Sequence, residues 1–168
     1  SVLAGLVVAF LDGVPLNEPE DQGAYFSNYP DLLNSLGSMQ VQRGVGISKN
    51  GVAAYAGSIQ LFSNAPSTDS VEARVGAGWG SFNSSRVFAA YSTGKIKQGF
   101  LNARISHLAS DGYKYHAGNR SQSAFLSGGK YWGKHVFRFN MLAGHQQNKM
   151  AWLGVSDSLL QIDPRTNV

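Results

Sequence analysis

The side chains of this sequence that could do chemistry do not stand at the spacing of a catalytic or metal-binding motif. There is no cysteine, and so no thiolate nucleophile or thiolate metal ligand. No Gly-x-Ser-x-Gly or His-Glu-x-x-His run occurs, and Gly44-Val45-Gly46 lacks the third glycine of a dinucleotide-binding loop. The four histidines show no metal-binding spacing: His107, His116, His135 and His145. We therefore expect a protein that is not an enzyme and that holds no cofactor or resident metal.

An acidic loop is expected over residues 17–28. Glu18, Glu20 and Asp21 provide carboxylate oxygens, which are the ligands that calcium prefers. The loop lacks the glycine and the ligand spacing of a known calcium-binding loop. No metal is assigned to it on this pattern.

The elements that position these side chains are predicted to be mainly strands. Charged residues make up only 14% of the chain, against roughly 25% in soluble domains, and 20 residues are glycine. Such a mixture favours a sheet with one apolar and one polar face over a compact helical enzyme.

Charge is distributed unevenly along the chain. Residues 1–65 contain two basic and five acidic residues, a net charge of −3, whereas residues 66–168 contain twelve basic and five acidic residues, a net charge of +7. Opposite signs on two segments suggest that they face each other. The basic residues stand singly, without a Lys/Arg cluster, so nucleic-acid binding is not expected.

From residue 70 onward, apolar and polar residues alternate with a period of two, which predicts strands with one apolar face. Leu101, Ala103 and Ile105 illustrate the apolar positions. Strands are expected over residues 71–79, 86–92, 101–106, 123–129 and 137–143. The arginines of these strands fall at polar positions: Arg74, Arg86, Arg104 and Arg138.

The expected connections between these strands differ in length. Residues 93–95 and 131–134 predict tight turns, and residues 111–121 and the stretch after Gly144 predict long polar loops. Residues 80–83 are short where regular alternation would need a long loop. Aromatic residues lie near strand ends, as in the interfacial belts of membrane barrels: Trp79, Tyr91, Tyr131 and Trp132. On alternation alone, a transmembrane barrel and a soluble β-sandwich both remain open.

Residues 1–65 predict a small α+β unit. Strands are expected over residues 6–11, 39–42 and 58–62, with a short helix between Pro30 and Gly37. A linker is expected at residues 64–68. The glycine-dense segment 37–64 predicts a backbone that turns sharply or passes close to another surface.

The order of these motifs resembles the TonB-dependent outer-membrane receptors, and most closely those of Bacteroidetes-type bacteria. In that family, a plug strand ending in Arg-Gly leads through a Tyr-Gly-type turn to a "GG-x-I-x-I" strand, and the barrel follows. Here Gln42-Arg43-Gly44 and residues 55–61, YAGSIQL, stand in those places. The resemblance extends from about Val7 to about Leu160 through further segments: Phe10–Asn17, Glu18–Gly23, Tyr25–Asn28, Ala103–Ser106, Ser110–Tyr113, Leu126–Gly129 and Trp152–Val155.

The resemblance implies a mainly β chain in the bacterial outer membrane. Residues 1–65 would form the C-terminal half of a plug, a small α+β unit, and residues 66–168 about the first five antiparallel strands of the transmembrane β-barrel. The chain is expected to be a fragment, because an open sheet would leave its edge N–H and C=O groups without partners in a bilayer.

The implied function is active uptake of a scarce nutrient, with a ferric siderophore as the default cargo. TonB, with ExbB and ExbD, would act on a part of the receptor that precedes this chain. Outer-membrane lipid and a surface lipoprotein are further partners that the resemblance suggests.

The resemblance also assigns site residues. The loop over residues 17–28 would meet the ligand, with Tyr25 and Phe26 stacking on it and Gln22 and Asn28 hydrogen-bonding to it. Alternatively, the two rings only pack the loop onto the plug. The arginines of the polar positions, together with Arg43, are expected at the plug–barrel interface, paired with acidic plug residues, or in part attracting an anionic ligand: Arg43, Arg74, Arg86, Arg104 and Arg138.

Two other functions remain as alternatives. One is a secreted β-sandwich that binds carbohydrate, and the other is a simple porin or adhesin barrel. A chain that is folded and monomeric in plain buffer would exclude a barrel, and a TonB box upstream in the parent gene would exclude a simple porin.

Overall fold

The computed structural model describes residues 7–44, 56–63, 70–150 and 154–167. It divides into two compact units, Ser1–Ala65 and Pro66–Val168, and each is described by itself. The expected linker at 64–68, the central part (45–55) of the glycine-dense segment 37–64, and Trp152 and Leu153 lie outside the described residues.

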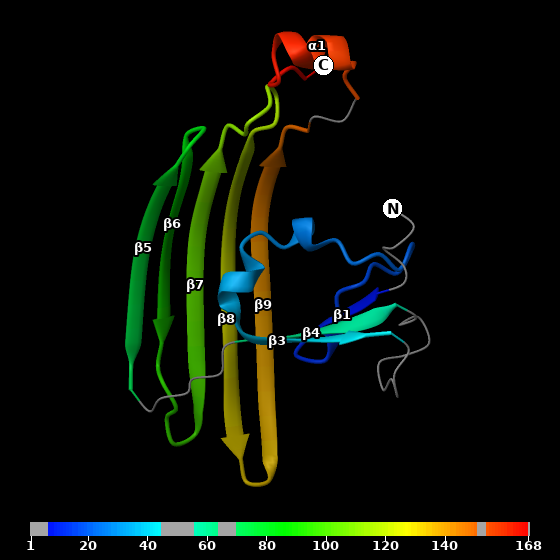
Figure 1. Cartoon of the computed structure of the whole chain (residues 1–168). Coiled ribbons are helices and arrows are strands. Elements are labelled where there is room, and N and C mark those ends of the chain that lie inside the picture. The colour runs from blue at the N-terminus through cyan, green and yellow to red at the C-terminus, as the bar shows by residue number, and fades with distance from the viewer. Residues whose placement is uncertain (1–6, 45–55, 64–69, 151–153, 168) are drawn as a thin grey trace. The chain divides into compact units, whose positions relative to one another are not determined.

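The first unit contains a four-stranded mixed sheet with the order β2-β1-β4-β3 (Figure 1). Its strands are β1 (Val7–Leu11), β2 (Val14–Pro15), β3 (Leu36–Arg43) and β4 (Gly57–Ser63). β1 and β4 are parallel, whereas β3 and β4 are antiparallel. The buried apolar residues of this unit are Val8, Ala9, Leu11, Leu32 and Leu61.

The helix expected between Pro30 and Gly37 is only a 3-10 turn, η3 (Leu32–Ser35). A second such turn, η2 (Phe26–Asn28), precedes it. Leu36 is already extended, with φ −95° and ψ 141°, so β3 begins three residues before the expected Met39. The sequence predicted a longer helix than the structure contains, because so few residues cannot offset the cost of nucleating an α-helix.

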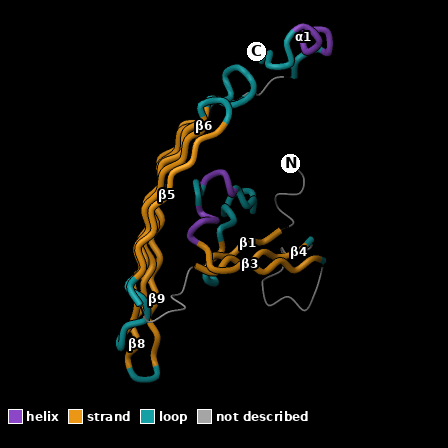
Figure 2. Tube along the Cα trace, turned by 60° about the vertical axis from the view of Figure 1, so that its left-hand side comes forward, coloured by secondary structure: helices purple, strands orange, loops and turns teal. Residues whose placement is uncertain are grey.

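The second unit is a five-stranded antiparallel sheet with the order β5-β6-β7-β8-β9 (Figure 1). Figure 2 shows these strands as a single layer. Their bounds are β5 (Glu72–Gly80), β6 (Ser84–Ser92), β7 (Gly99–Ser110), β8 (Asn119–Trp132) and β9 (His135–Asn148). The prediction of a mainly β, antiparallel chain is therefore confirmed. In the described part of the chain, no helix has the length and apolar character needed to span a membrane.

The strands β7 to β9 are longer than their apolar alternation predicts. β8 begins at Asn119 rather than residue 123, and β9 continues through Gly144 to Asn148. These ends carry mostly polar side chains, so they resemble loops in sequence, yet their backbone pairing continues without a break. A helix, α1 (Asp157–Ile162), follows in a stretch expected to be a loop.

Strand register gives the sheet two different faces. Residues directly opposite one another on paired strands point to the same side, and neighbours along a strand point to opposite sides. We call one side the polar face: the even-numbered residues of β5, β6, β7 and β9 and the odd-numbered residues of β8. The other side, with the opposite parity, is the apolar face. Leu101, Ala103 and Ile105 share it, as the alternation predicts.

The connections lie at two ends of the sheet. Residues 93–98 and 133–134 connect strands at the turn end, and residues 81–83 and 111–118 at the loop end. Trp79, Tyr91 and Trp132 all belong to the apolar face. Tyr131 does not, because it neighbours Trp132 in β8 and so points to the polar face. Its assignment to the same aromatic belt is therefore wrong.

Gly57 shows why the segment before β4 needs glycine. It lies at the start of the central strand, opposite Val7 on one side and Arg43 on the other. Its φ is +154°, and a Cβ placed there would lie 2.3 Å from the carbonyl oxygen of Gln42. The obstacle is backbone, so it cannot move aside as a flexible side chain would.

We predict that Gly57→Ala destabilises the β1–β4–β3 pairing by roughly 1–3 kcal/mol, the usual cost of a locally strained backbone. Hydrogen exchange of the β1 and β4 amides should be faster in this variant. Gly78→Ala is the control, because a Cβ at Gly78 meets no atom within 4 Å. Equal exchange in both variants would contradict the close approach.

Candidate functional site

The loop over residues 17–28 is fastened to β1 by one side chain. The Asn17 Oδ1 atom accepts a hydrogen bond from the Ala9 backbone N–H at 2.8 Å. The Asn17 Nδ2 atom donates to the carbonyl oxygens of Val7 and Gln22, at 2.9 and 2.7 Å. These three bonds fix both the start of the loop and its middle relative to the sheet.

The predicted ligand-binding residues divide into two pairs. Tyr25 and Asn28 use their polar atoms inside the loop: the Tyr25 hydroxyl donates to the Asp21 carboxylate, and Asn28 Nδ2 donates to Glu18 Oε1 at 3.0 Å. All four residues are exposed, Tyr25 at 38% and Phe26 at 42%. The hydrogen bond within the loop supports a packing role for Tyr25, while ligand contact by all four residues stays a prediction.

The carboxylates of this loop serve as internal acceptors. Asp21 Oδ1 accepts the Gly23 backbone N–H at 2.8 Å, and its other oxygen accepts the Tyr25 hydroxyl. The hydrogen bond from Tyr25 and then that from Gly23 lower the pKa of Asp21, and the Asp21 carboxylate raises the pKa of Tyr25. Among the described residues, no group of three or more His, Asp or Glu side chains could hold a metal ion.

The four predicted arginines of the second unit share the polar face. Arg74 and Arg104 lie in one row, both opposite Ala90 of the intervening strand β6. On β6, Arg86 lies four residues before Ala90. On β9, Arg138 lies opposite Gly129 of β8, which in turn lies opposite Phe100 of β7. The strand register thus places side chains that are far apart in the sequence on one face of the sheet.

Arg74 and Arg86 illustrate the contacts that these arginines make within the sheet. Arg74 Nε lies 3.0 Å from Glu72 Oε1 in an exposed ion pair. The Arg86 guanidinium lies over the Phe88 ring, 4.9 Å from its centroid. Arg43 belongs to the first unit, where it pairs with Gly57 at the end of β3. A plug–barrel interface formed by all five arginines stays a prediction.

A cluster at the loop end of the sheet was not predicted as a site. The Arg165 guanidinium lies over the Tyr115 and Phe82 rings, 4.8 and 5.7 Å from their centroids. Its Nε atom donates to the Tyr113 carbonyl oxygen at 2.9 Å. The Tyr115 N–H in turn donates to the Arg165 carbonyl oxygen at 2.9 Å. The segment after α1 is thereby tied to the loop between β7 and β8.

Next to this cluster is a polar hollow of about 650 Å³. Lys114, Lys149 and Arg165 line it, together with Asp111. Asp111 accepts a hydrogen bond from Asn83 Nδ2 at 2.6 Å, so its charge is partly engaged by the neighbouring connection. The other charged side chains of the lining are basic: Lys114, Arg120, Lys149 and Arg165. This excess of positive charge suits an anionic ligand. The sequence signal was the run Asp111–His116, in which aromatic and basic residues follow a turn.

Comparison with known proteins gives a match in structure only. No family model matches the chain, and no curated protein matches it in sequence. Among solved structures, the chain is similar to the pyoverdine outer membrane receptor FpvA from Pseudomonas aeruginosa PAO1, determined with pyoverdine bound, with a TM-score of 0.63 and 13% sequence identity. The similarity covers 83% of this chain and 20% of that receptor, so the chain spans about a fifth of the receptor's length. At this identity the likeness is one of fold.

We predict that Tyr25→Phe raises the pKa of Asp21 toward its ordinary value, because the largest cause of the lowered pKa is the Tyr25 hydroxyl. An Asp with a lowered pKa stabilises the folded loop above its unfolded-state pKa, and that contribution is lost as the pH falls through the folded-state pKa. The variant should therefore be less stable than the parent at neutral pH, and the difference in stability should disappear in acid.

Carboxyl-carbon NMR titration measures this shift directly. Phe26→Leu changes the adjacent ring without removing a hydroxyl group, and it should leave the titration of Asp21 unchanged. An Asp21 that titrates identically in the parent and in Tyr25→Phe would rule out the assigned hydrogen bond as the cause.

Proposed function

We propose that this chain is part of a TonB-dependent transporter of the bacterial outer membrane, which takes up a scarce nutrient such as a ferric siderophore. The observation that carries the proposal is the apolar face of β5–β9. The fold likeness to an outer membrane receptor supports it independently.

The apolar face exposes large side chains along every strand of the second unit. Val75 and Trp79 are 84% and 80% exposed on β5, and Ile105 is 62% exposed on β7. Others on the same face are also exposed: Val87, Tyr91, Leu101, Trp132, Phe137, Phe139 and Met141. A continuous apolar surface across five strands is costly in water, and it is the surface that a bilayer stabilises.

A bilayer would also require the edges of the sheet to be paired. β5 and β9 are the outer strands of the described sheet, and in lipid each unpaired N–H or C=O of an edge strand costs several kcal/mol. We infer that further strands pair with these edges and close a barrel, which for this receptor type has about 22 strands.

In this proposal the first unit acts as the plug and the protein carries out no covalent chemistry. TonB, energised through ExbB and ExbD, would rearrange the plug, and a surface lipoprotein could assist capture. Cargo would meet Gln22 and Phe26 of the loop over residues 17–28, and the basic hollow near Arg165 would attract an anionic cargo such as a ferric siderophore. The arginines of the polar face would pair with plug carboxylates or guide the same cargo.

We predict that Met141→Lys destabilises the full-length protein in lipid vesicles by roughly 2–4 kcal/mol, the cost of a lysine facing the centre of a bilayer, because Met141 lies in the middle of the apolar run Phe137–Ala143 of β9. In water, the same substitution at an exposed position would change stability by only about 0.5 kcal/mol or less. Urea unfolding in vesicles measures the difference.

Gly78→Lys is the matched control for this prediction, since Gly78 lies on the polar face with open space around it. If both lysines are tolerated equally, or if the protein is folded and monomeric in plain buffer, the face does not meet lipid. A secreted carbohydrate-binding β-sandwich would then be favoured.

We also predict that bacteria expressing the full-length protein accumulate radiolabelled iron from at least one of three ferric siderophore classes: hydroxamate, catecholate or mixed. Uptake should stop when TonB is deleted. Phe26→Ala should lower the apparent affinity about three- to tenfold, the value of one aromatic stacking contact, whereas the exposed Leu33→Ala should not. Uptake that persists without TonB would instead indicate a simple porin.

A further inference from the structure

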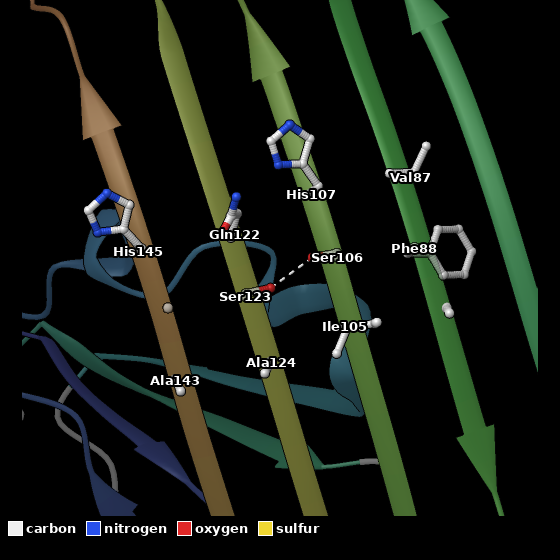
Figure 3. A pocket seen from close by; sticks show the side chains of 12 residues that line it. Val87, Phe88, Ile105, Ser106, His107, Gln122, Ser123, Ala124, Ala143 and His145 are labelled. Atoms are coloured by element: carbon white, nitrogen blue, oxygen red, sulfur yellow. Dashed lines mark hydrogen bonds between the residues drawn. The ribbon is translucent and has the colours of Figure 1, made fainter.

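The boundary of the apolar face at the loop end carries a row of polar side chains. Register aligns Val87, His107, Gln122 and His145 across β6, β7, β8 and β9. One row further toward the loops lies Arg120, opposite Gln147. His107, Gln122 and His145 stand side by side on three adjacent strands (Figure 3).

A hollow of about 710 Å³ lies along this boundary. Its lining includes Ala124 and Ala143, which face each other across β8 and β9. The next row toward the turn end holds the larger Leu126 and Met141, and the row toward the loop end holds Gln122 and His145. The two alanines therefore leave a depression with an apolar floor and a polar rim on one side (Figure 3).

The charge of this face has one sign. All residues of β5–β9 are described, and on the apolar face of these strands the charged residues are Arg120 and Lys130, with no Asp or Glu. His107 and His145 can each donate a hydrogen bond in either protonation state. Arg120 is exposed, and it also borders the polar hollow at the loop end. A ligand on this rim is therefore recognised by donors and positive charge, which favours a phosphate group.

We propose that this hollow is a binding site for a membrane lipid with a phosphorylated head group. One acyl chain would lie against Ala124 and Ala143, and the phosphate would be held by His107, Gln122 and His145, with Arg120 beyond them. The inference rests on the proposed membrane location of the sheet. It adds a specific lipid partner to the face that would otherwise contact lipid only non-specifically.

The experiment places the full-length protein in nanodiscs of phosphatidylcholine doped with phosphatidylglycerol of the same acyl chains. Native mass spectrometry then counts the lipids that stay bound on release. We expect the protein to retain phosphatidylglycerol selectively. A His107→Leu and His145→Leu double variant should bind it with roughly tenfold lower apparent affinity, because the hydrogen bonds from the two imidazoles to the phosphate are lost. Ala124→Leu, which fills the floor without touching the rim, should also abolish retention.

His135→Leu is the control, because His135 lies on the same face at the turn end of β9. Retention that is unchanged in both the rim and the floor variants would overturn the site. Equal competition by inorganic phosphate would also overturn it, because that result would indicate a site for a free anion. A dimer that Ala124→Leu converts to a monomer would overturn it too, because a second copy of the chain would then occupy the hollow. A protein that fails to enter nanodiscs at all would refute the membrane location itself.

Discussion

The register of β5–β9 is the constraint on which the rest of the second unit depends. A slip of one residue between two strands would exchange their polar and apolar faces. Glycine–aromatic pairs oppose such a slip: a Cβ at Gly128 would lie 2.4 Å from the Phe139 ring, and a Cβ at Gly129 would lie 2.6 Å from the Phe100 ring. Gly128 accommodates the Phe139 ring on the apolar face, and Gly129 accommodates the Phe100 ring on the polar face. The register of β8 is therefore fixed relative to both β7 and β9.

The same register concentrates positively charged side chains on the polar face. All residues of β5–β9 are described, and this face carries four arginines but a single carboxylate, Glu72. The ion pair of Glu72 with Arg74 is exposed, and such pairs contribute only about 0–1 kcal/mol. The polar face therefore carries a net positive charge, contributed by arginines on four different strands.

The sequence predicted the strands of the second unit well and their ends poorly. Period-two alternation located all five strands and the face shared by the arginines, because burial and exposure repeat with the pleat. It missed the polar end of β9 from Gly144 to Asn148, where backbone pairing continues without an apolar signal. It also missed the contact of Arg165 with Tyr113, because 52 positions separate the two residues and the contact depends on how the chain returns after α1.

The borders of the apolar face differ between the two edges of the sheet, although Ala109 on β7 lies in the row of Trp79 and Trp132 on β8 lies one row beyond Phe137. At the loop end, the last apolar residue on β5 is Trp79, which lies in the row of Gln147 of β9. On β9 itself the last apolar residue is Ala143, four residues closer to the turn end. At the turn end, the border moves from Tyr91 on β6, in the row of Met141, to Phe137 on β9. With a rise of about 3.3 Å per residue and a strand spacing of about 4.8 Å, the loop-end shift over four strand intervals corresponds to a tilt of roughly 35°, and the turn-end shift over three intervals to roughly 43°, between the strands and the normal of the apolar band. Strands of membrane barrels tilt by about 35–45°, so the inclination of these borders is of the size that the proposed membrane location requires.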